Sequence, residues 1–369
     1  LPKEPPDQDE GLRLTGRWQL LVLTHPNHPP TLVTMLTTLI LAFSSSPAQA
    51  AEVTYLPSKM GGDVTLSYRT DQARLPLEES GESVGQVGVH NHWLTLSGVF
   101  SVLDDLSIGL EIPGQLLSRL SYEDSHVMAW NPTEEAGSLL SGAQEDFSSV
   151  DGKGLNGAWF SLLGTPLSEA RGHQATWLLE IGLRNRTKNN FWSAEGEKRG
   201  AGPGAAAQRL VATFSTTRGP ASPYVQATLL RQGEIDVELE EGNTTIAPER
   251  RATFTAGSEF FHYEKPEQGI RISSDYRLSA GYHTDAQLPS GLWLPDVLPI
   301  SAGQTTNRGE YTSLQTSAGL NWQFAPEVKA RLAGSFGWQS PTRLEHPYPV
   351  YTDGSLLWGI STSVTYLVR

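Results

Sequence analysis

The pattern that recurs along this chain is alternation between apolar and polar residues. Its clearest instance is GIRISSDYRLSAGYHT at 269–284, where Tyr276 and Leu278 alternate with Asp275 and Arg277. Successive side chains of a β-strand point to opposite faces, so this stretch predicts a strand with one wet face and one dry face. The stretch is longer than an ordinary strand, since strands in globular proteins usually have about five or six residues. Such a strand suits a large soluble sandwich or barrel, or a barrel that spans a bilayer.

Stretches of this kind recur after residue 50 and predict twelve strands. They are 64–69, 93–102, 106–112, 156–164, 177–184, 210–214, 225–229, 253–263, 270–284, 313–322, 328–338 and 360–368. Two of them, 156–164 and 253–263, alternate less regularly than the others. An even number of antiparallel strands is typical of outer-membrane barrels.

The connections between these strands alternate in length. The short ones are 103–105, 165–174, 218–222, 264–268 and 325–327. The long ones are 70–91, 113–155, 185–207, 232–252, 285–309 and 339–353. Outer-membrane barrels have short periplasmic turns and long extracellular loops, whereas a soluble barrel has no reason to gather its long loops at one end. The sequence therefore predicts an all-β fold: a transmembrane antiparallel up-and-down β-barrel of about 12 strands.

Aromatic residues and composition fit this interpretation. The apolar faces carry Trp177, Tyr282, Trp322, Trp338 and Tyr366 near strand ends, as an aromatic girdle requires. Mean hydropathy is −0.31, which argues against a helical membrane protein, while a membrane barrel meets lipid with alternate residues only. There is no cysteine, so disulfides, cysteine zinc sites and thiol catalysis are excluded. The net charge of −13 argues against nucleic acid as a partner.

Residues 31–50, TLVTMLTTLILAFSSSPAQA, are predicted to be a secretory signal. An apolar segment is followed by small residues that end in Ala48-Gln49-Ala50, a pattern of signal-peptide cleavage. The preceding THPNHPP lacks the usual positive charge, and a short interfacial helix is the alternative. We therefore expect an N-terminal extension and signal over 1–50 and a single outer-membrane barrel domain over 51–369.

Two stretches resemble a known family. FSVLDDLSIGLEIPGQLL (100–117) and ATWLLEIGLRNRTKNN (175–190) look like outer-membrane channels of the meta-pathway of phenol degradation. The match rests on Leu103-Asp104-Asp105-Leu106 followed by Gly109-Leu110-Glu111-Ile112-Pro113, and it covers about a third of the chain. The resemblance implies a porin-like barrel or transporter for small solutes and supplies no catalytic residues.

The polar faces of the predicted strands carry charges of both signs, which we expect to line the lumen. These residues are Glu180, Arg184, Arg271, Asp275, Arg277, Lys329 and Arg331. A barrel of twelve strands should enclose a narrow lumen. The predicted function is passive passage of small solutes, with hydrophobic or aromatic compounds as candidates. The alternatives are a plugged structural or surface-interaction barrel, in which the charges pair and fill the lumen, and an outer-membrane enzyme.

The sequence offers only weak evidence for a catalytic or metal-binding site. None of the nine histidines has serine two positions later, the pairing that a barrel phospholipase needs. Asp124 and His126 resemble a protease pair, and His90 and His92 resemble two metal ligands that lack a third. We expect no catalytic residue, no metal and no cofactor.

Two acidic segments leave alternatives open. Residues 234–241, EIDVELEE, are either a hairpin above the membrane or a mouth that binds divalent cations with lipopolysaccharide. Loop 113–155 is either an inserted plug or a surface lid. The expected partners are outer-membrane lipid, lipopolysaccharide and a small solute.

Overall fold

The computed structural model describes most of the chain from Thr54 onward. The described residues are 54, 56–79, 82–123, 128–130, 139–141, 150–187, 194–195, 198–199, 204–239, 242–289, 305–345, 350–352 and 354–368. The predicted extension and signal over 1–50 lie outside them, so the division at residue 50 stays a prediction.

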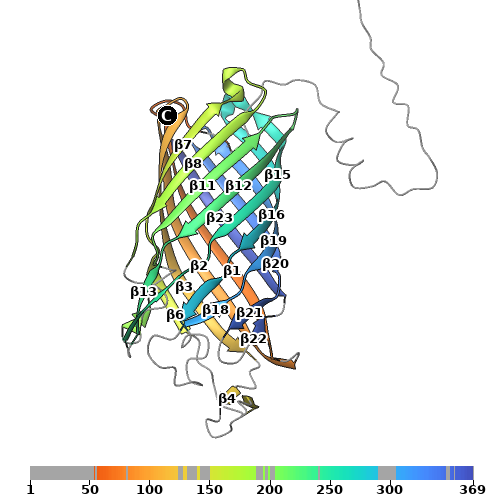
Figure 1. Ribbon diagram of the computed structural model, residues 1–369. Coiled ribbons are helices and arrows are strands. Elements are labelled where there is room, and N and C mark those ends of the chain that lie inside the picture. Colours follow the sequence, from red (N-terminus) through yellow and green to blue (C-terminus); the bar gives the residue numbers. More distant parts are fainter. Residues whose placement is uncertain are drawn as a thin grey trace, which may run out of the picture. The chain divides into compact units, whose positions relative to one another are not determined.

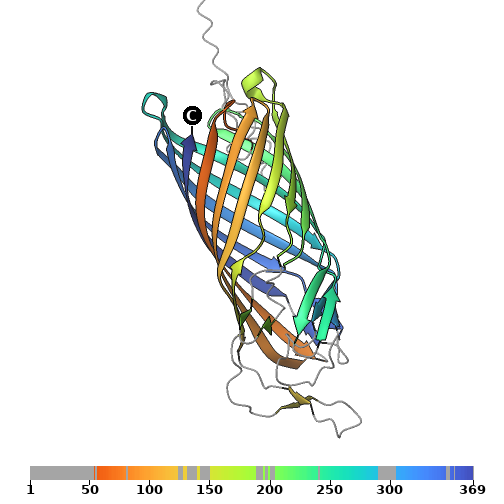
Figure 2. The same cartoon turned by 90° about the vertical axis from the view of Figure 1, so that its left-hand side faces the viewer.

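Twelve long strands form one closed antiparallel barrel (Figures 1 and 2). They are β1 (Gly62–Glu79), β2 (Glu82–Leu103), β3 (Leu106–Glu123), β7 (Trp159–Leu167), β8 (Thr176–Arg184), β11 (Ala207–Ser215), β12 (Ala221–Gln232), β15 (Arg251–Lys265), β16 (Ile270–His283), β19 (Tyr311–Ala325), β20 (Val328–Gln339) and β23 (Ser355–Val368). Each pairs with the next, and β23 returns to β1 in a ladder from Gly62↔Val368 to Arg74↔Leu356. The predicted all-β barrel of twelve strands is confirmed.

Shorter elements accompany the barrel strands. They are β4 (Met128–Trp130), β5 (Leu139–Ser141), β6 (Val150–Leu155), β9 (Ala194–Glu195), β10 (Lys198–Arg199), β13 (Ile235–Leu239), β14 (Gly242–Ile246), β17 (Ala286–Pro289), β18 (Thr305–Arg308), β21 (Thr342–Glu345) and β22 (Val350–Thr352). Two 3₁₀ turns, η2 (Glu169–Arg171) and η3 (Pro266–Gln268), close short connections. Among the described residues, no helix is long and apolar enough to cross a membrane.

The short turns lie at the end of the barrel that holds the C-terminus, and β13, β18, β21 and β22 lie at the other end (Figures 1 and 2). The prediction of a long loop over residues 70–91 is wrong. Strands β1 and β2 continue through it, with pairs from Thr70↔His92 to Glu79↔Glu82. Strand β3 likewise runs to Glu123, into the predicted loop 113–155. These extensions carry no apolar stripe because they project past the apolar band, so alternation could not reveal them.

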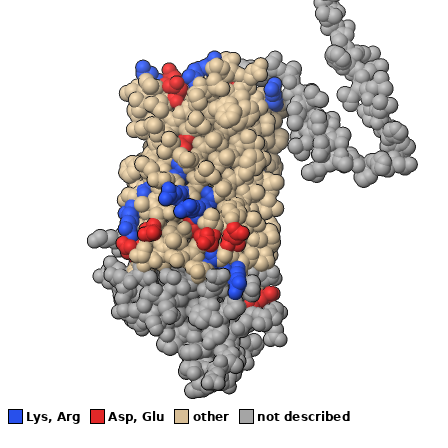
Figure 3. Space-filling model, in the orientation of Figure 1, with Lys and Arg blue, Asp and Glu red and all other residues tan. Residues whose placement is uncertain are grey.

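The two faces of the wall differ as the alternation predicts. Large apolar side chains face outward and stay exposed, for example Ile181 (54 %) and Leu332 (58 %). The five aromatic residues of the predicted girdle are exposed as well. On the side drawn in Figure 3, charged residues gather near the turn end and in the lower half, and the band between them is nearly free of charge. An apolar outer belt on a closed sheet is what a bilayer requires.

The segment 234–241 is mostly hairpin, as one of the two interpretations expects. Strands β13 and β14 pair from Ile235↔Ile246 to Leu239↔Gly242. Ile235, Val237 and Ile246 are buried together with Ala205, so the apolar side of the hairpin forms a small core. Its acidic side includes Asp236, which pairs with Arg186 at 2.5 Å.

The chain enters the barrel at the turn end before β1 begins. Thr54 is 1 % exposed, and its hydroxyl lies 2.6 Å from that of Ser215, on the inner face of β11. Pro57 is buried too.

Charge on the two faces should have opposite consequences for stability. Leu320→Arg places a cation on the outer face of β19, where Leu320 is 52 % exposed. In lipid this should destabilise the barrel by about 2–4 kcal/mol. Gln315→Arg lies on the inner face of the same strand and should unfold at nearly the parental urea concentration. We would measure both variants after refolding into detergent or lipid. Equal losses would contradict the assignment of faces.

Candidate functional site

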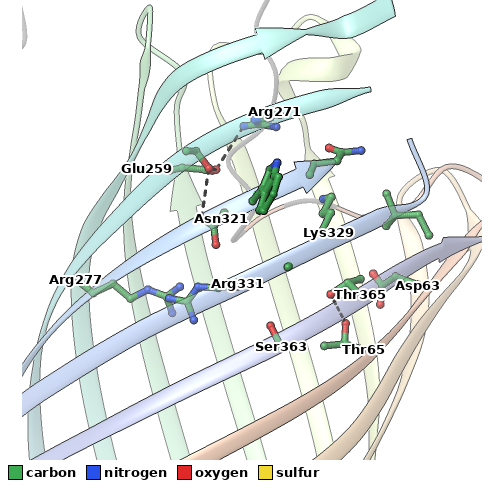
Figure 4. Close-up of a pocket in the computed structure, with 15 residues that line it drawn as sticks. Asp63, Thr65, Glu259, Arg271, Arg277, Asn321, Lys329, Arg331, Ser363 and Thr365 are labelled. Atoms are coloured by element: carbon green, nitrogen blue, oxygen red, sulfur yellow. Dashed lines mark hydrogen bonds and ion pairs between the residues drawn. The ribbon is translucent and has the colours of Figure 1, made fainter. Parts of the chain in front are cut away.

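One carboxylate organises the inner wall formed by β16, β19 and β20. Asp275 accepts hydrogen bonds from Arg277 Nε at 2.8 Å and from Arg331 Nη2 at 2.9 Å, and its side chain is only 4 % exposed. Asn321 Nδ2 lies 3.4 Å from Asp275 Oδ1. Arg277 and Arg331 lie side by side in Figure 4. A single buried carboxylate thus holds two guanidinium groups, and this triad keeps a net positive charge.

A second network lies closer to the turns. Ser273 Oγ donates to Glu259 Oε1 at 2.6 Å, and Arg271 Nη2 lies 3.5 Å from the same oxygen. Arg271 also stacks on Phe261, with its guanidinium carbon 3.9 Å from the ring centroid. The Glu259 side chain is 3 % exposed, so its charge is neutralised within the wall.

The Asp275 triad stands between two cavities. The one nearer the turns has a volume of about 340 Å³ and is lined by residues that include Thr65, Arg271 and Lys329. The other has a volume of about 210 Å³ and is lined by residues that include Arg69 and Gln315. Arg277 and Arg331 line both cavities. The triad therefore forms a charged boundary between the two cavities along the inner wall.

A separate cluster covers the wall formed by β3, β7, β8 and β11. Arg209 pairs with Glu180 at 2.7 Å and with Glu111 at 3.4 Å. Its guanidinium lies over the ring of Trp159 at 4.6 Å, and that of Arg184 lies over the same ring at 5.3 Å. The lumen thus presents an aromatic ring between charged groups.

The structure places the seven predicted lumen residues in these two groups. Arg271, Asp275, Arg277, Lys329 and Arg331 come together on one wall, and Glu180 and Arg184 join the Trp159 cluster. Their part in permeation stays a prediction.

Several important lumen residues were not predicted. Glu111 and Arg209 lie beside Leu110 and Leu210, so the same alternation that predicts the other lumen residues could have found them. Glu259 could have been found in the same way, because it alternates regularly with the outward Phe254. Phe261 could not, because it is an apolar residue on the inner face, just before a β-bulge that interrupts the register of β15 against β16.

The ion pair between Asp275 and Arg331 lies close against β19 at Gly319. A Cβ at this position would lie 2.5 Å from Asp275 Oδ1 and 2.8 Å from Arg331 Nη2. Without a side chain at this position the ion pair lies directly across β19, and a Cβ would force the two charged groups to shift. This requirement depends on neighbouring strands and is invisible in the alternation.

A further charged cluster lies at the long-loop end of the barrel. Glu249 pairs with Arg308, and it accepts hydrogen bonds from His283 Nδ1 and the Tyr311 hydroxyl, both at 3.1 Å. His283 stacks on Tyr311 with ring centroids 4.1 Å apart. Burial alone would raise the pKa of Glu249. The His283 hydrogen bond and the Arg308 charge outweigh burial and lower the pKa to about 2.

The structure adds little support to the candidate catalytic and metal-binding residues. His92 Nδ1 lies 2.7 Å from the Tyr68 hydroxyl. No group of three or more His, Asp or Glu side chains within the described part of the chain is placed to hold a metal ion. Asp124 and His126 lie outside the described residues.

The expectation that the chain lacks the G-x-S-x-G motif of serine hydrolases is wrong. Residues 81–85 read GESVG, a match to G-x-S-x-G. That motif needs a strand-to-helix turn to present its serine. Here Ser83 lies within β2 and pairs with Glu78 of β1, so the motif lacks the required backbone setting.

No protein-family model matches the chain, and no curated protein matches it. The resemblance to channels of the phenol meta-pathway therefore stays a prediction.

Solved outer-membrane barrels resemble the structure only distantly. An outer membrane channel from Pseudomonas putida F1 is 13 % identical, with a TM-score of 0.49 over 86 % of this chain and 99 % of that one. The toluene transporter TodX of Pseudomonas putida is 10 % identical, with a TM-score of 0.41 over 88 % and 96 %. The outer membrane protease OmpT of Escherichia coli is 10 % identical, with a TM-score of 0.32 over 84 % and 97 %. Because these scores lie below 0.5, the strand pairing itself establishes the fold.

Filling the space above Gly319 should disturb the Asp275 triad. In Gly319→Ala the new methyl meets Asp275 and Arg331, and overpacking of this kind costs about 1–3 kcal/mol. Gly334→Ala is the matched control, because no atom lies within 4 Å of its added Cβ. Urea unfolding of both variants measures the difference. If the two variants lost equal stability, the proposed close contact would be wrong.

The Glu249 cluster should make the barrel less stable in acid. Its pKa of about 2 lies below the ordinary 4.5, so folding favours the ionised form. The resulting stabilisation is complete above pH 4.5 and is lost as the pH falls toward 2. The loss should be about 2–3 kcal/mol. Urea midpoints at pH 6 and pH 2.5 should differ less in Glu249→Gln than in the parent or in Glu264→Gln, an exposed control. An unchanged difference in Glu249→Gln would refute this origin.

Proposed function

We propose that the protein is an outer-membrane channel for the passive passage of small solutes through a narrow charged lumen. The observation that carries the proposal is the pair of cavities on either side of the Asp275 triad. A lumen built only to be rigid needs no such space. The apolar outer belt supports insertion in lipid, with lipopolysaccharide as the expected neighbour on the outer leaflet.

The charged lumen favours solutes that carry an anionic group. Trp159 and Phe261 each lie under an arginine, and Trp159 is only 7 % exposed, so these ring faces are already occupied. The guanidinium groups can bind carboxylate or other polar substituents. Among the hydrophobic or aromatic compounds expected from the sequence, we therefore favour those with an anionic substituent.

A closed structural barrel is the second candidate. The ion pairs span neighbouring strands, and Thr54 lies against the inner wall at the turn end. In that case the pairs stiffen the wall and the cavities hold only water. Enzymatic activity lacks an observation that favours it.

Conductance distinguishes the two candidates, and two substitutions test the triad. The purified parent in a planar bilayer should give discrete single-channel currents. Asp275→Asn removes the charge that offsets two arginines, so the reversal potential under a salt gradient should shift toward greater anion preference. Arg277→Ser removes a cation and should shift it the opposite way.

Arg119→Gln serves as the control, since Arg119 lies at the long-loop end in a half-exposed pair with Asp151. Its selectivity should match that of the parent. A parent without conductance at any voltage would favour the closed barrel. Folded, conducting triad variants with the parental selectivity would show that the triad does not govern permeation.

A further inference from the structure

The cavity nearer the turns has an unusual excess of cationic side chains. Arg271, Arg277, Lys329 and Arg331 line it, and the acids among its lining residues are Asp63 and Glu259 (Figure 4). Asp275 lies beside it and adds a third negative charge. Four cations thus face three acids inside the barrel, where charges are screened less than on the outer surface.

Arg271 has buried donors that are not satisfied. Its Nε and Nη2 atoms are inaccessible to solvent and have no hydrogen-bond partner. The closest carboxylate oxygen, Glu259 Oε1, is 3.5 Å from Nη2 and already accepts from Ser273. Leaving buried donors unpaired is costly, and the cost is larger for a charged group. Stacking on Phe261 fixes the plane of the guanidinium and so fixes the direction of these donors.

The other charges nearby are already engaged. Asp275 is shared by Arg277 and Arg331, so it cannot turn to satisfy Arg271. Asn321 donates weakly to Ser273 and Asp275 at 3.4 Å, and its Oδ1 is buried without a donor. The wall of the cavity therefore contains a guanidinium and an amide oxygen that are only partly hydrogen-bonded.

We propose that this cavity binds a small oxyanion, with Arg271 as its anchor. A planar guanidinium matches the oxygens of a carboxylate or phosphate in bidentate fashion. Hydrogen phosphate is favoured over a carboxylate such as benzoate, because its greater negative charge gains more from the four cations that line the cavity. Within the proposed channel, which this inference deepens, the cavity is a binding station for anionic solutes.

Binding can be measured without transport. Isothermal titration of the refolded full chain in non-ionic detergent, at low ionic strength, would use sodium phosphate and sodium benzoate in separate arms. We expect saturable binding of phosphate and weaker binding of benzoate. Arg271→Gln should weaken phosphate binding by about tenfold or more, as loss of a charge-assisted hydrogen bond implies. Arg119→Gln also removes one positive charge, far from the cavity, and should bind as the parent does.

Arg271→Lys keeps the charge without the planar fork and covers the case in which Arg271→Gln does not fold. It too should bind phosphate more weakly than the parent. Absence of binding to both anions, or equal affinity in the parent and in a folded Arg271 variant, would overturn the proposal. A barrel that binds phosphate without conducting would refute the channel and leave the anion site standing.

Discussion

The closing ladder between β23 and β1 is the constraint on which the rest of this structure depends. In hydrocarbon, an unpaired backbone N–H or C=O has no water to bond and costs several kcal/mol. A twelve-stranded sheet with free edges would carry two rows of such groups. The pairing from Gly62↔Val368 to Arg74↔Leu356 removes both edges. Once the sheet is closed, every residue on it faces either lipid or lumen, and alternation in the sequence becomes a choice between these two surroundings.

Closure also determines what the lumen must contain. Where side chains fill the lumen, inward-facing charges are buried and find partners on neighbouring strands. Asp275 binds arginines of its own strand and of β20, and Arg209 of β11 joins carboxylates from β8 and β3. Such pairs are strong only when each charge keeps its hydrogen bonds. Small residues such as Gly319 let these long side chains lie flat along the wall.

The barrel could be predicted from the sequence because one-dimensional alternation contains the necessary information. The alternation alone is enough to predict that residues such as Arg271 and Lys329 face inward. Three features did not follow. The bulge after Phe261 switches parity within β15, the extensions of β1 and β2 leave the lipid and lose their apolar stripe, and the contact above Gly319 joins strands far apart in the chain. Each depends on pairing between strands, which a single strand's sequence does not encode.

Pairing between neighbours also explains why the lumen is not uniformly neutral. Asp275 can neutralise only one of the two arginines that it binds, while the charge of Glu259 is already offset by Arg271. The wall therefore keeps positive charge beside a cavity, although the chain as a whole carries a net charge of −13. Net charge describes the whole chain, whereas the potential inside a cavity depends on the few groups that line it. An acidic protein can thus carry a cationic cavity, because Arg271, Arg277, Lys329 and Arg331 lie together on its inner wall.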